Sequence, residues 1–190
     1  KGGKTNITMN CIDRHLETKG EQTAILWEGN EPGENRSLTY NQLHSEVCRF
    51  SNVLKKRGVL KGDRVSIYMP MVPELAIAML ACARIGAIHS IVFGGFSSTA
   101  LADRITDSSC TFLITTDGSF RGKKPVPVKA NADKAIKLAA INGVEVKTCI
   151  VVEHVGSKIP TEMTSGRDYW WHDEMKSPEP ICDPEQMDAE

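Results

Sequence analysis

Apolar residues follow two alternating patterns along the middle of the chain. Short runs that are predominantly apolar and rich in β-branched residues predict buried strands. These runs are 64–69, 87–93, 111–116 and 146–152. Helices are predicted between the runs, over about 73–84, 98–108 and 131–140, and the first of them begins at Pro73 and is apolar on almost every side. Regular strand–helix alternation is typical of an α/β fold, so we expect a mainly parallel sheet with helices on both faces.

A further helix is predicted before the first of these strands. Thr39 and Gln42 have the spacing of a capping box, in which each side chain satisfies a free backbone N–H of the other residue. The earlier part of the chain predicts only a short helix near 12–18 and a strand at 24–29, and the pattern fades after residue 153. The sequence therefore divides into an N-terminal segment (1–37), an α/β subdomain (38–153) and an irregular segment (154–190).

Composition narrows the class of protein. The 190 residues carry a formal net charge of −1, which gives no argument for a nucleic-acid or membrane partner, so an anion site must come from a local cluster. None of the six cysteines forms a C-x-x-C pair, and none has zinc-site spacing with histidine. We expect reduced thiols in an intracellular, cytoplasmic protein. Because the first residue is Lys, we also expect the chain to be part of a longer one.

Two stretches could bind an anion, and each has a plainer explanation. Gly94 and Gly95 separate a predicted strand from the helix-starting residues 97–99, and glycine lets backbone N–H groups approach a phosphate. The stretch matches neither common glycine-rich phosphate motif, and from spacing alone a turn that merely permits close packing is favoured. Arg121, Gly122, Lys123 and Lys124 follow the third strand, at the same sheet edge, where ligands of parallel sheets bind. They could equally form a solvated basic loop.

Other chemistry-bearing residues are scattered. The five histidines have no ligand spacing, and His89 lies within an apolar strand, where we expect a hydrogen-bonded core residue rather than a base. The aromatic stretch at 170–172 is expected to pack against the domain. We identify no catalytic residue and no metal site from the residues themselves.

Four stretches closely resemble the AMP-forming acetyl-CoA synthetases, which are members of the adenylate-forming superfamily. They are NCIDRHLETKG (10–20), AILWEG (24–29), the long block 66–105 and the segment 121–134. The resemblance implies a ligase that makes acetyl-CoA from acetate, ATP and CoA with Mg²⁺. It implies an acetyl-adenylate intermediate, release of AMP and pyrophosphate, and small-molecule partners only. The family's ATP phosphate loop and catalytic lysine are absent, so we expect an N-terminal part of such an enzyme that is inactive by itself.

The resemblance also assigns the two anion-binding candidates. It implies that 38–153 carries a surface for the nucleotide of CoA. The stretch Arg121, Gly122, Lys123 and Lys124 would bind its phosphates, with Arg121 as the firm match, and Phe93, Gly94 and Gly95 would flank its adenine. Lys124 replaces an arginine found in some relatives and loses the planar fork, while Lys123 replaces a glycine. Residues 187–190 resemble the stretch that precedes the ATP phosphate loop.

Two alternatives come from other classes of protein. One is a non-catalytic α/β module that binds an anionic nucleotide. The other is a phospho-receiver domain, which needs acidic residues clustered after the first strand of the sheet. That position offers only Glu74, so the receiver is excluded.

Overall fold

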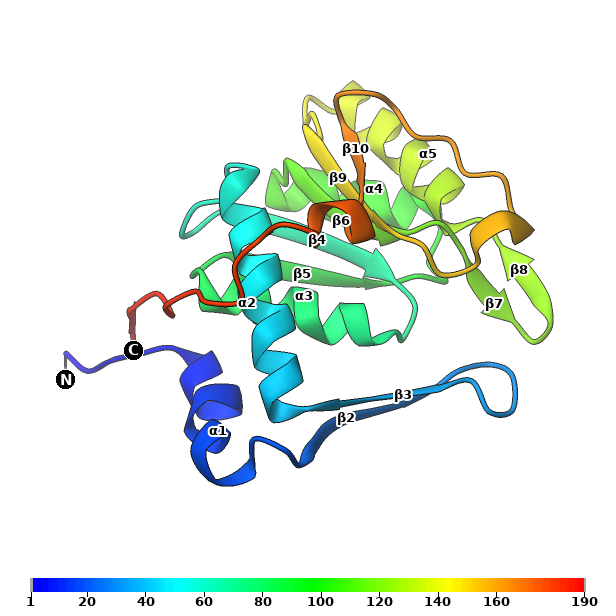
Figure 1. Cartoon of the computed structure of the whole chain (residues 1–190). Coiled ribbons are helices and arrows are strands. Elements are labelled where there is room, and N and C mark those ends of the chain that lie inside the picture. The colour runs from blue at the N-terminus through cyan, green and yellow to red at the C-terminus, as the bar shows by residue number, and fades with distance from the viewer. Residues whose placement is uncertain (1, 190) are drawn as a thin grey trace.

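A five-stranded parallel sheet lies at the centre of the computed structural model, which describes residues 2–189 (Figure 1). Its strand order is β10-β9-β6-β4-β5, and every neighbouring pair is parallel. The strands are β4 (Arg64–Met69), β5 (Ile88–Phe93), β6 (Phe112–Thr116), β9 (Thr148–Val152) and β10 (Asp168–Trp170). The predicted α/β fold with a mainly parallel sheet is confirmed, and four of these strands coincide with the predicted apolar runs.

Two helices cover each face of this sheet (Figure 1). Alternate residues of a strand point to opposite faces. Ile67 and Ile114 pack on one face with α2 (Tyr40–Lys56) and α3 (Pro73–Arg84), while Tyr68 and Leu113 pack on the other with α4 (Ser98–Ser108) and α5 (Val128–Ile141). The inner strands β4, β6 and β9 are therefore buried on both faces, which is why their sequences are largely apolar, whereas the edge strand β5 is partly exposed.

The capping box at the start of α2 is present as predicted. The Gln42 amide donates to the Thr39 hydroxyl oxygen at 3.2 Å, and the Thr39 amide donates to the Gln42 side-chain oxygen at 2.9 Å. Helix α5 begins three residues earlier than predicted, at Val128, directly after Pro127. None of the helices described is long and apolar enough to cross a membrane.

The N-terminal segment is more regular than its sequence indicated. It contains β1 (Lys4–Thr5), a π-helical turn (Met9–Asp13), α1 (Arg14–Lys19), β2 (Thr23–Glu28) and β3 (Asn35–Thr39). Strands β2 and β3 form a long antiparallel hairpin. The sequence predicted β2 but not β3, because the residues of β3 are mostly polar and exposed and carry no apolar alternation.

Residues after 153 are not wholly irregular, which corrects that expectation. Strand β10 pairs in parallel with β9, and α6 (Trp171–Glu174) follows it. Trp171 stacks on Phe50 with ring centroids 3.8 Å apart, so the expected aromatic packing is confirmed. Strand β11 (Met187–Asp188) pairs with β1, which brings the two ends of the described chain together (Figure 1). Strands of two or three residues are too short to show a hydrophobic period.

The six cysteines are free thiols, and all but Cys11 are buried. Burial raises the pKa of Cys82 and that of Cys149 to about 12, so both thiols stay protonated at neutral pH. These two cysteines act as small apolar residues of the core.

Candidate functional site

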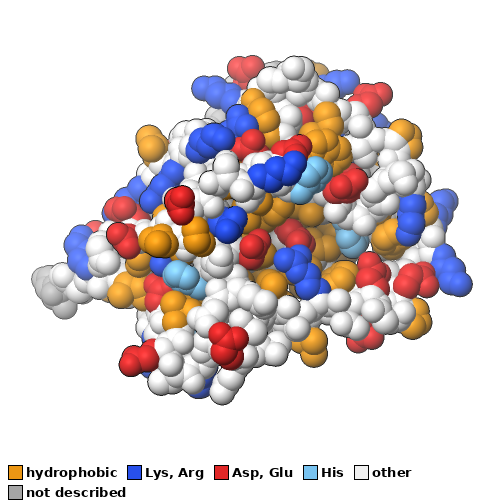
Figure 2. All heavy atoms as spheres, viewed as in Figure 1, with side chains coloured by type: hydrophobic (Ala, Val, Ile, Leu, Met, Phe, Trp, Pro, Cys, Tyr) orange, Lys and Arg blue, Asp and Glu red, His pale blue; other side chains and the backbone are white. Residues whose placement is uncertain are grey.

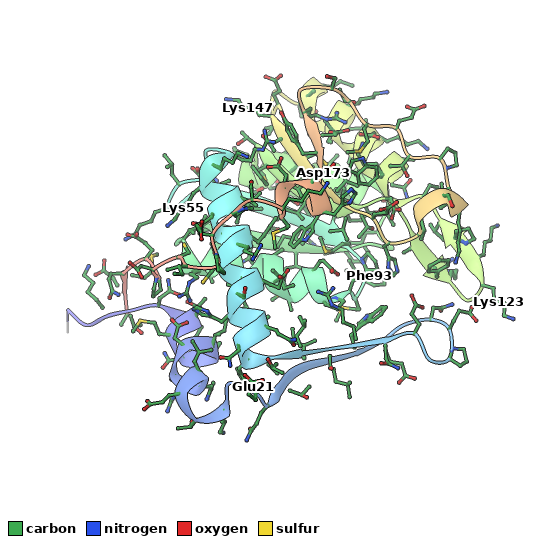
Figure 3. All side chains as sticks on the ribbon, viewed as in Figure 1. Glu21, Lys55, Phe93, Lys123, Lys147 and Asp173 are labelled. Atoms are coloured by element: carbon green, nitrogen blue, oxygen red, sulfur yellow. The ribbon has the colours of Figure 1, made fainter. Side chains whose placement is uncertain are left out.

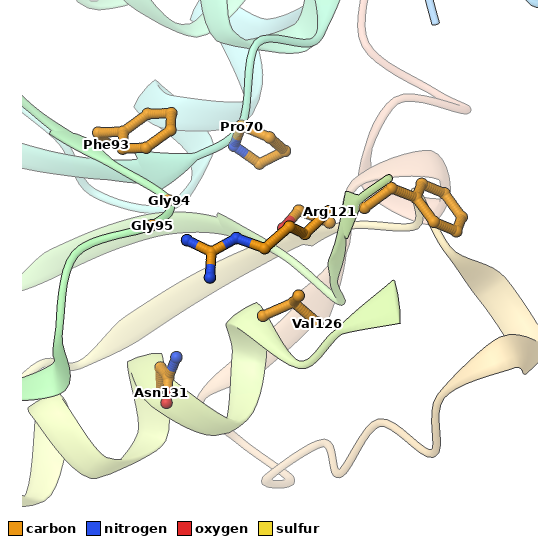
Figure 4. A pocket seen from close by; sticks show the side chains of 9 residues that line it. Pro70, Phe93, Gly94, Gly95, Arg121, Val126 and Asn131 are labelled. Atoms are coloured by element: carbon orange, nitrogen blue, oxygen red, sulfur yellow. The ribbon is translucent and has the colours of Figure 1, made fainter. Parts of the chain in front are cut away.

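A cavity of about 350 Å³ lies at the carboxyl ends of β4, β5 and β6 (Figure 4). Parallel sheets bind their ligands at this edge. The lining residues come from three strand–helix connections and from the first turn of α5, and we call the cavity the edge pocket. They are Pro70, Phe93, Gly94, Gly95, Ser119, Phe120, Arg121, Val126 and Asn131. The structure thus brings together both stretches that the sequence singled out.

The Gly94–Gly95 turn forms one wall of the edge pocket. A Cβ atom on Gly94 would lie 2.9 Å from the Met69 carbonyl carbon and 3.0 Å from the Pro70 nitrogen, which is too close for any other residue without a shift of backbone. The turn therefore needs glycine in order to pass the end of β4. Phe93, just before it, is 58% exposed and offers an aromatic face at the pocket.

The basic stretch is a hairpin rather than a loop. Strands β7 (Ser119–Arg121) and β8 (Lys124–Val126) pair antiparallel, and Gly122 at the tip has a φ of +58°. The guanidinium of Arg121 points toward the Gly94–Gly95 turn (Figure 4). Lys123 lies at the outer tip of the hairpin (Figure 3), and neither it nor Gly122 nor Lys124 lines the edge pocket. Of the four residues in the stretch, the structure brings Arg121 alone to the pocket.

A buried carboxylate holds the base of this hairpin. Asp117, at the end of β6, is 2% exposed and accepts hydrogen bonds from four backbone amides. The donors are Gly118 at 2.6 Å, His154 at 2.8 Å, Val155 at 3.1 Å and Gly156 at 2.8 Å. The carboxylate therefore ties the chain entering β7 to the turn that follows β9. Sequence reasoning did not find Asp117, because its partners lie far along the chain.

The tip of the β7–β8 hairpin is held by a hydrogen bond from the β2–β3 hairpin. The Asn30 carboxamide, at the tip of the β2–β3 hairpin, donates to the Gly122 carbonyl oxygen at 2.5 Å. In Figure 1 the tip of the β2–β3 hairpin lies close to the β7–β8 hairpin at the right of the view. Near the base, the Phe120 ring meets the edge of His154, with ring centroids 5.6 Å apart. The N-terminal segment thus contributes to the position of the basic hairpin.

The charge around the pocket is local. Figure 2 shows basic and acidic side chains interspersed over the face in view, which agrees with the net charge of −1. Within residues 2–189, no group of three or more His, Cys, Asp or Glu side chains is arranged to hold a metal ion. His89 is partly buried in β5, and burial lowers its pKa.

The edge pocket combines one guanidinium, exposed aromatic surface and a close backbone turn, which suits a phosphate attached to a planar ring system.

Comparison with known proteins places the chain in a family. Residues 12–188 match the model of the family described as "AMP-binding enzyme". The chain therefore belongs to the AMP-binding enzyme family.

Its curated relatives include named synthetases. The chain is 59% identical over 188 residues to the acetyl-coenzyme A synthetase of Desulfatibacillum aliphaticivorans, a match that covers 99% of this chain and 28% of that protein. It is 60% identical to the acetyl-coenzyme A synthetase of Sinorhizobium fredii, over 99% of this chain and 29% of that protein. The chain thus spans less than a third of the length of these relatives.

A solved structure shares the fold. The acetoacetyl-CoA synthetase from Streptomyces lividans superposes with a TM-score of 0.81 at 25% sequence identity, over 97% of this chain and 27% of that one. The α/β fold described above is therefore shared with part of that synthetase.

Proposed function

We propose that the chain is part of an acetate–CoA ligase and that its edge pocket binds the nucleotide end of CoA. The proposed enzyme makes acetyl-CoA from acetate and ATP, with Mg²⁺, through an acetyl-adenylate. The chain's similarity to acetyl-coenzyme A synthetases supports the activity. The observation that carries the binding site is the Arg121 guanidinium, which points across the pocket toward the Gly94–Gly95 turn beside exposed Phe93.

The pocket chemistry matches that ligand part by part. Phe93 is exposed, so its ring offers an aromatic face on which the flat adenine ring can stack. Arg121 can donate two parallel hydrogen bonds to phosphate oxygens. Lys123 and Lys124 lie on the hairpin beyond the pocket, where their charge would attract the 3′-phosphate and the diphosphate without close contact.

The proposal gives each segment a place in the larger enzyme. Residues 38–153 form the subdomain with the CoA-nucleotide surface, and residues 1–37 supply the hairpin that supports it. Residues 154–190 lead toward the ATP site. Neither catalytic side chains nor Mg²⁺ ligands are assigned among these residues, so the chain alone is proposed to be inactive, and the whole enzyme is proposed to act in the cytoplasm.

Titration calorimetry with CoA, dephospho-CoA and ADP tests the binding site. We expect CoA to bind most tightly, and Arg121→Ala to weaken it by about 10- to 100-fold, the factor for losing a hydrogen bond to a charged group. Arg104→Ala, on the exposed side of α4, is the matched control and should leave the affinity unchanged. A folded chain that binds no CoA would contradict the proposal.

ADP binding as tight as CoA binding would favour the non-catalytic nucleotide module instead. An equal effect of Arg121→Ala and Arg104→Ala would show that Arg121 does not bind the nucleotide. Acetate-dependent exchange of pyrophosphate into ATP should be undetectable with this chain, and its detection would overturn the proposed inactivity.

A further inference from the structure

Two walls of the edge pocket come from distant parts of the chain and are backed by the same buried tyrosine. One wall is the Gly94–Gly95 turn, and the other is the first turn of α5, which carries Asn131. Tyr68 lies beneath both. Its side chain is fully buried (0% exposed) within the core between the sheet and helices α4 and α5.

The phenol hydroxyl contacts the glycine turn directly. It donates a hydrogen bond to the Phe96 carbonyl oxygen at 2.7 Å, directly after the two glycines. On the side of α5, the Tyr68 ring belongs to the same core cluster as Val128 and Ala132, which flank the turn of helix that carries Asn131. Asn131 lines the pocket, whereas Tyr68 does not. The hydroxyl thus lies behind the pocket surface, out of reach of a ligand.

The glycine turn has few other means of holding its position. Its own backbone hydrogen bonds are Gly94 N–H to the Met69 carbonyl at 3.2 Å and Phe96 N–H to the Phe93 carbonyl at 2.9 Å. Gly94 and Gly95 have no side chains that could pack, and glycine gains the most backbone freedom when a contact is lost. The bond from Tyr68 is the side-chain contact that ties this turn to the layer below it.

We propose that Tyr68 is a positioning residue for the edge pocket, whose hydroxyl holds the Gly94–Phe96 turn against the core layer of α4 and α5 without touching the ligand. The proposal rests on the proposed function, because the pocket it describes is the one assigned to the CoA nucleotide. Burial raises the pKa of Tyr68, so the hydroxyl is a neutral donor at physiological pH and has no acid–base part in binding.

Removing one oxygen atom tests this role. Tyr68→Phe keeps the ring in the core and deletes only the hydroxyl. The matched control is Thr115→Val, because the buried Thr115 hydroxyl donates to the backbone carbonyl of Tyr68 itself at 2.7 Å but does not reach the turn. Both variants lose one buried hydroxyl hydrogen bond in the same layer, so their melting temperatures should fall by similar amounts.

Hydrogen exchange and CoA titration then separate the two variants. We expect Tyr68→Phe to speed amide exchange in residues 94–97 by about 10-fold and to weaken CoA binding by about fivefold, because the pocket wall must be ordered on binding. Thr115→Val should change neither quantity. Faster exchange with weaker binding in Tyr68→Phe alone would support the positioning role.

The remaining outcomes overturn a stated part of the proposal. Unchanged exchange in 94–97 would show that the hydroxyl does not hold the turn, whatever the ligand. Faster exchange with unchanged CoA affinity would show that the turn's position does not matter for binding. Equal effects of the two variants, or failure of Tyr68→Phe alone to fold, would give Tyr68 a general stabilising role. If the wild-type chain does not bind CoA, the proposed function is refuted, and the positioning role that rests on it is refuted as well.

Discussion

Asp117→Asn is the substitution for which the structure gives the sharpest expectation. The side chain keeps its size and shape, but one carboxylate oxygen becomes an NH₂ group. Oδ1 of Asp117 accepts from the amides of Gly118 and His154, while Oδ2 accepts from Gly156 at 2.8 Å. The Asn side chain has one oxygen, which can accept hydrogen bonds from the amides on one side only. Its nitrogen is a donor, so the amides that faced the other carboxylate oxygen lose their acceptor.

The expected cost follows from the lost acceptor and the lost charge. Leaving the Gly156 amide without a partner in a part-buried position costs about 1–3 kcal/mol. The bonds that remain become neutral ones, which are roughly half as strong as bonds to a carboxylate. We therefore expect the free energy of unfolding to fall by about 3 kcal/mol and the melting temperature by about 6–12 °C for a chain of this size.

Guanidinium denaturation followed by circular dichroism and tryptophan fluorescence measures this difference. The control is Asp63→Asn, because the exposed Asp63 carboxylate accepts one backbone hydrogen bond, from Leu60 at 2.8 Å. It should cost less than about 1 kcal/mol. If Asp117→Asn costs no more than Asp63→Asn, the four amides are not held by the charge, and Asp117 does not fix the β7–β8 hairpin.

Two more substitutions probe the pocket wall and the acid sensitivity of the fold. Gly94→Ala should destabilise the chain by about 1–3 kcal/mol and weaken CoA binding in calorimetry, because the added Cβ would lie 3.0 Å from the Pro70 nitrogen; an unchanged affinity would contradict this. Burial raises the pKa of Asp168, but hydrogen bonds from Arg167 and Lys129 outweigh it and the pKa lies below its usual value. A lowered pKa stabilises the fold above the unfolded-state pKa, and this stabilisation is lost as the pH falls through the folded-state value. Unfolding free energy measured between pH 5 and pH 3 should therefore fall more steeply in the wild type than in Asp168→Asn, and parallel slopes would refute this.

The parts of the fold that could be predicted are those whose signal lies within a few neighbouring residues. Strands β4, β6 and β9 lie within the sheet and β5 lies at its edge, and all four contain runs of apolar and β-branched residues that stand out in the sequence. Strand β10 has three residues and takes its place by pairing with β9, a contact that no local pattern records. Strand β3 is exposed and polar, and its partner β2 defines it.

The candidate site also contains parts that the sequence could predict and parts that it could not. Parallel strands end at one edge, which is why the sequence alone could place the Gly94–Gly95 turn and Arg121 near each other. The direction of each side chain could not be predicted. Lys123 points outward because it lies at a hairpin tip, and Asn131 lines the pocket because α5 begins three residues earlier than its apolar period indicates.

Long-range polar contacts supply the missing information. Tyr68 meets Phe96 across 28 residues, Asp117 meets residues 154–156 across 37 to 39, and Asn30 meets Gly122 across 92. Each contact joins a side chain to the backbone of a loop at this edge of the sheet or next to it, so it sets where the loop lies without contributing much apolar burial. The apolar core places the strand ends, and these three side chains place the loops on them. Substitutions in the two groups should therefore act differently. Core changes lower stability throughout the sheet, whereas loss of the Tyr68 or Asn30 contact should alter the pocket more than the melting temperature.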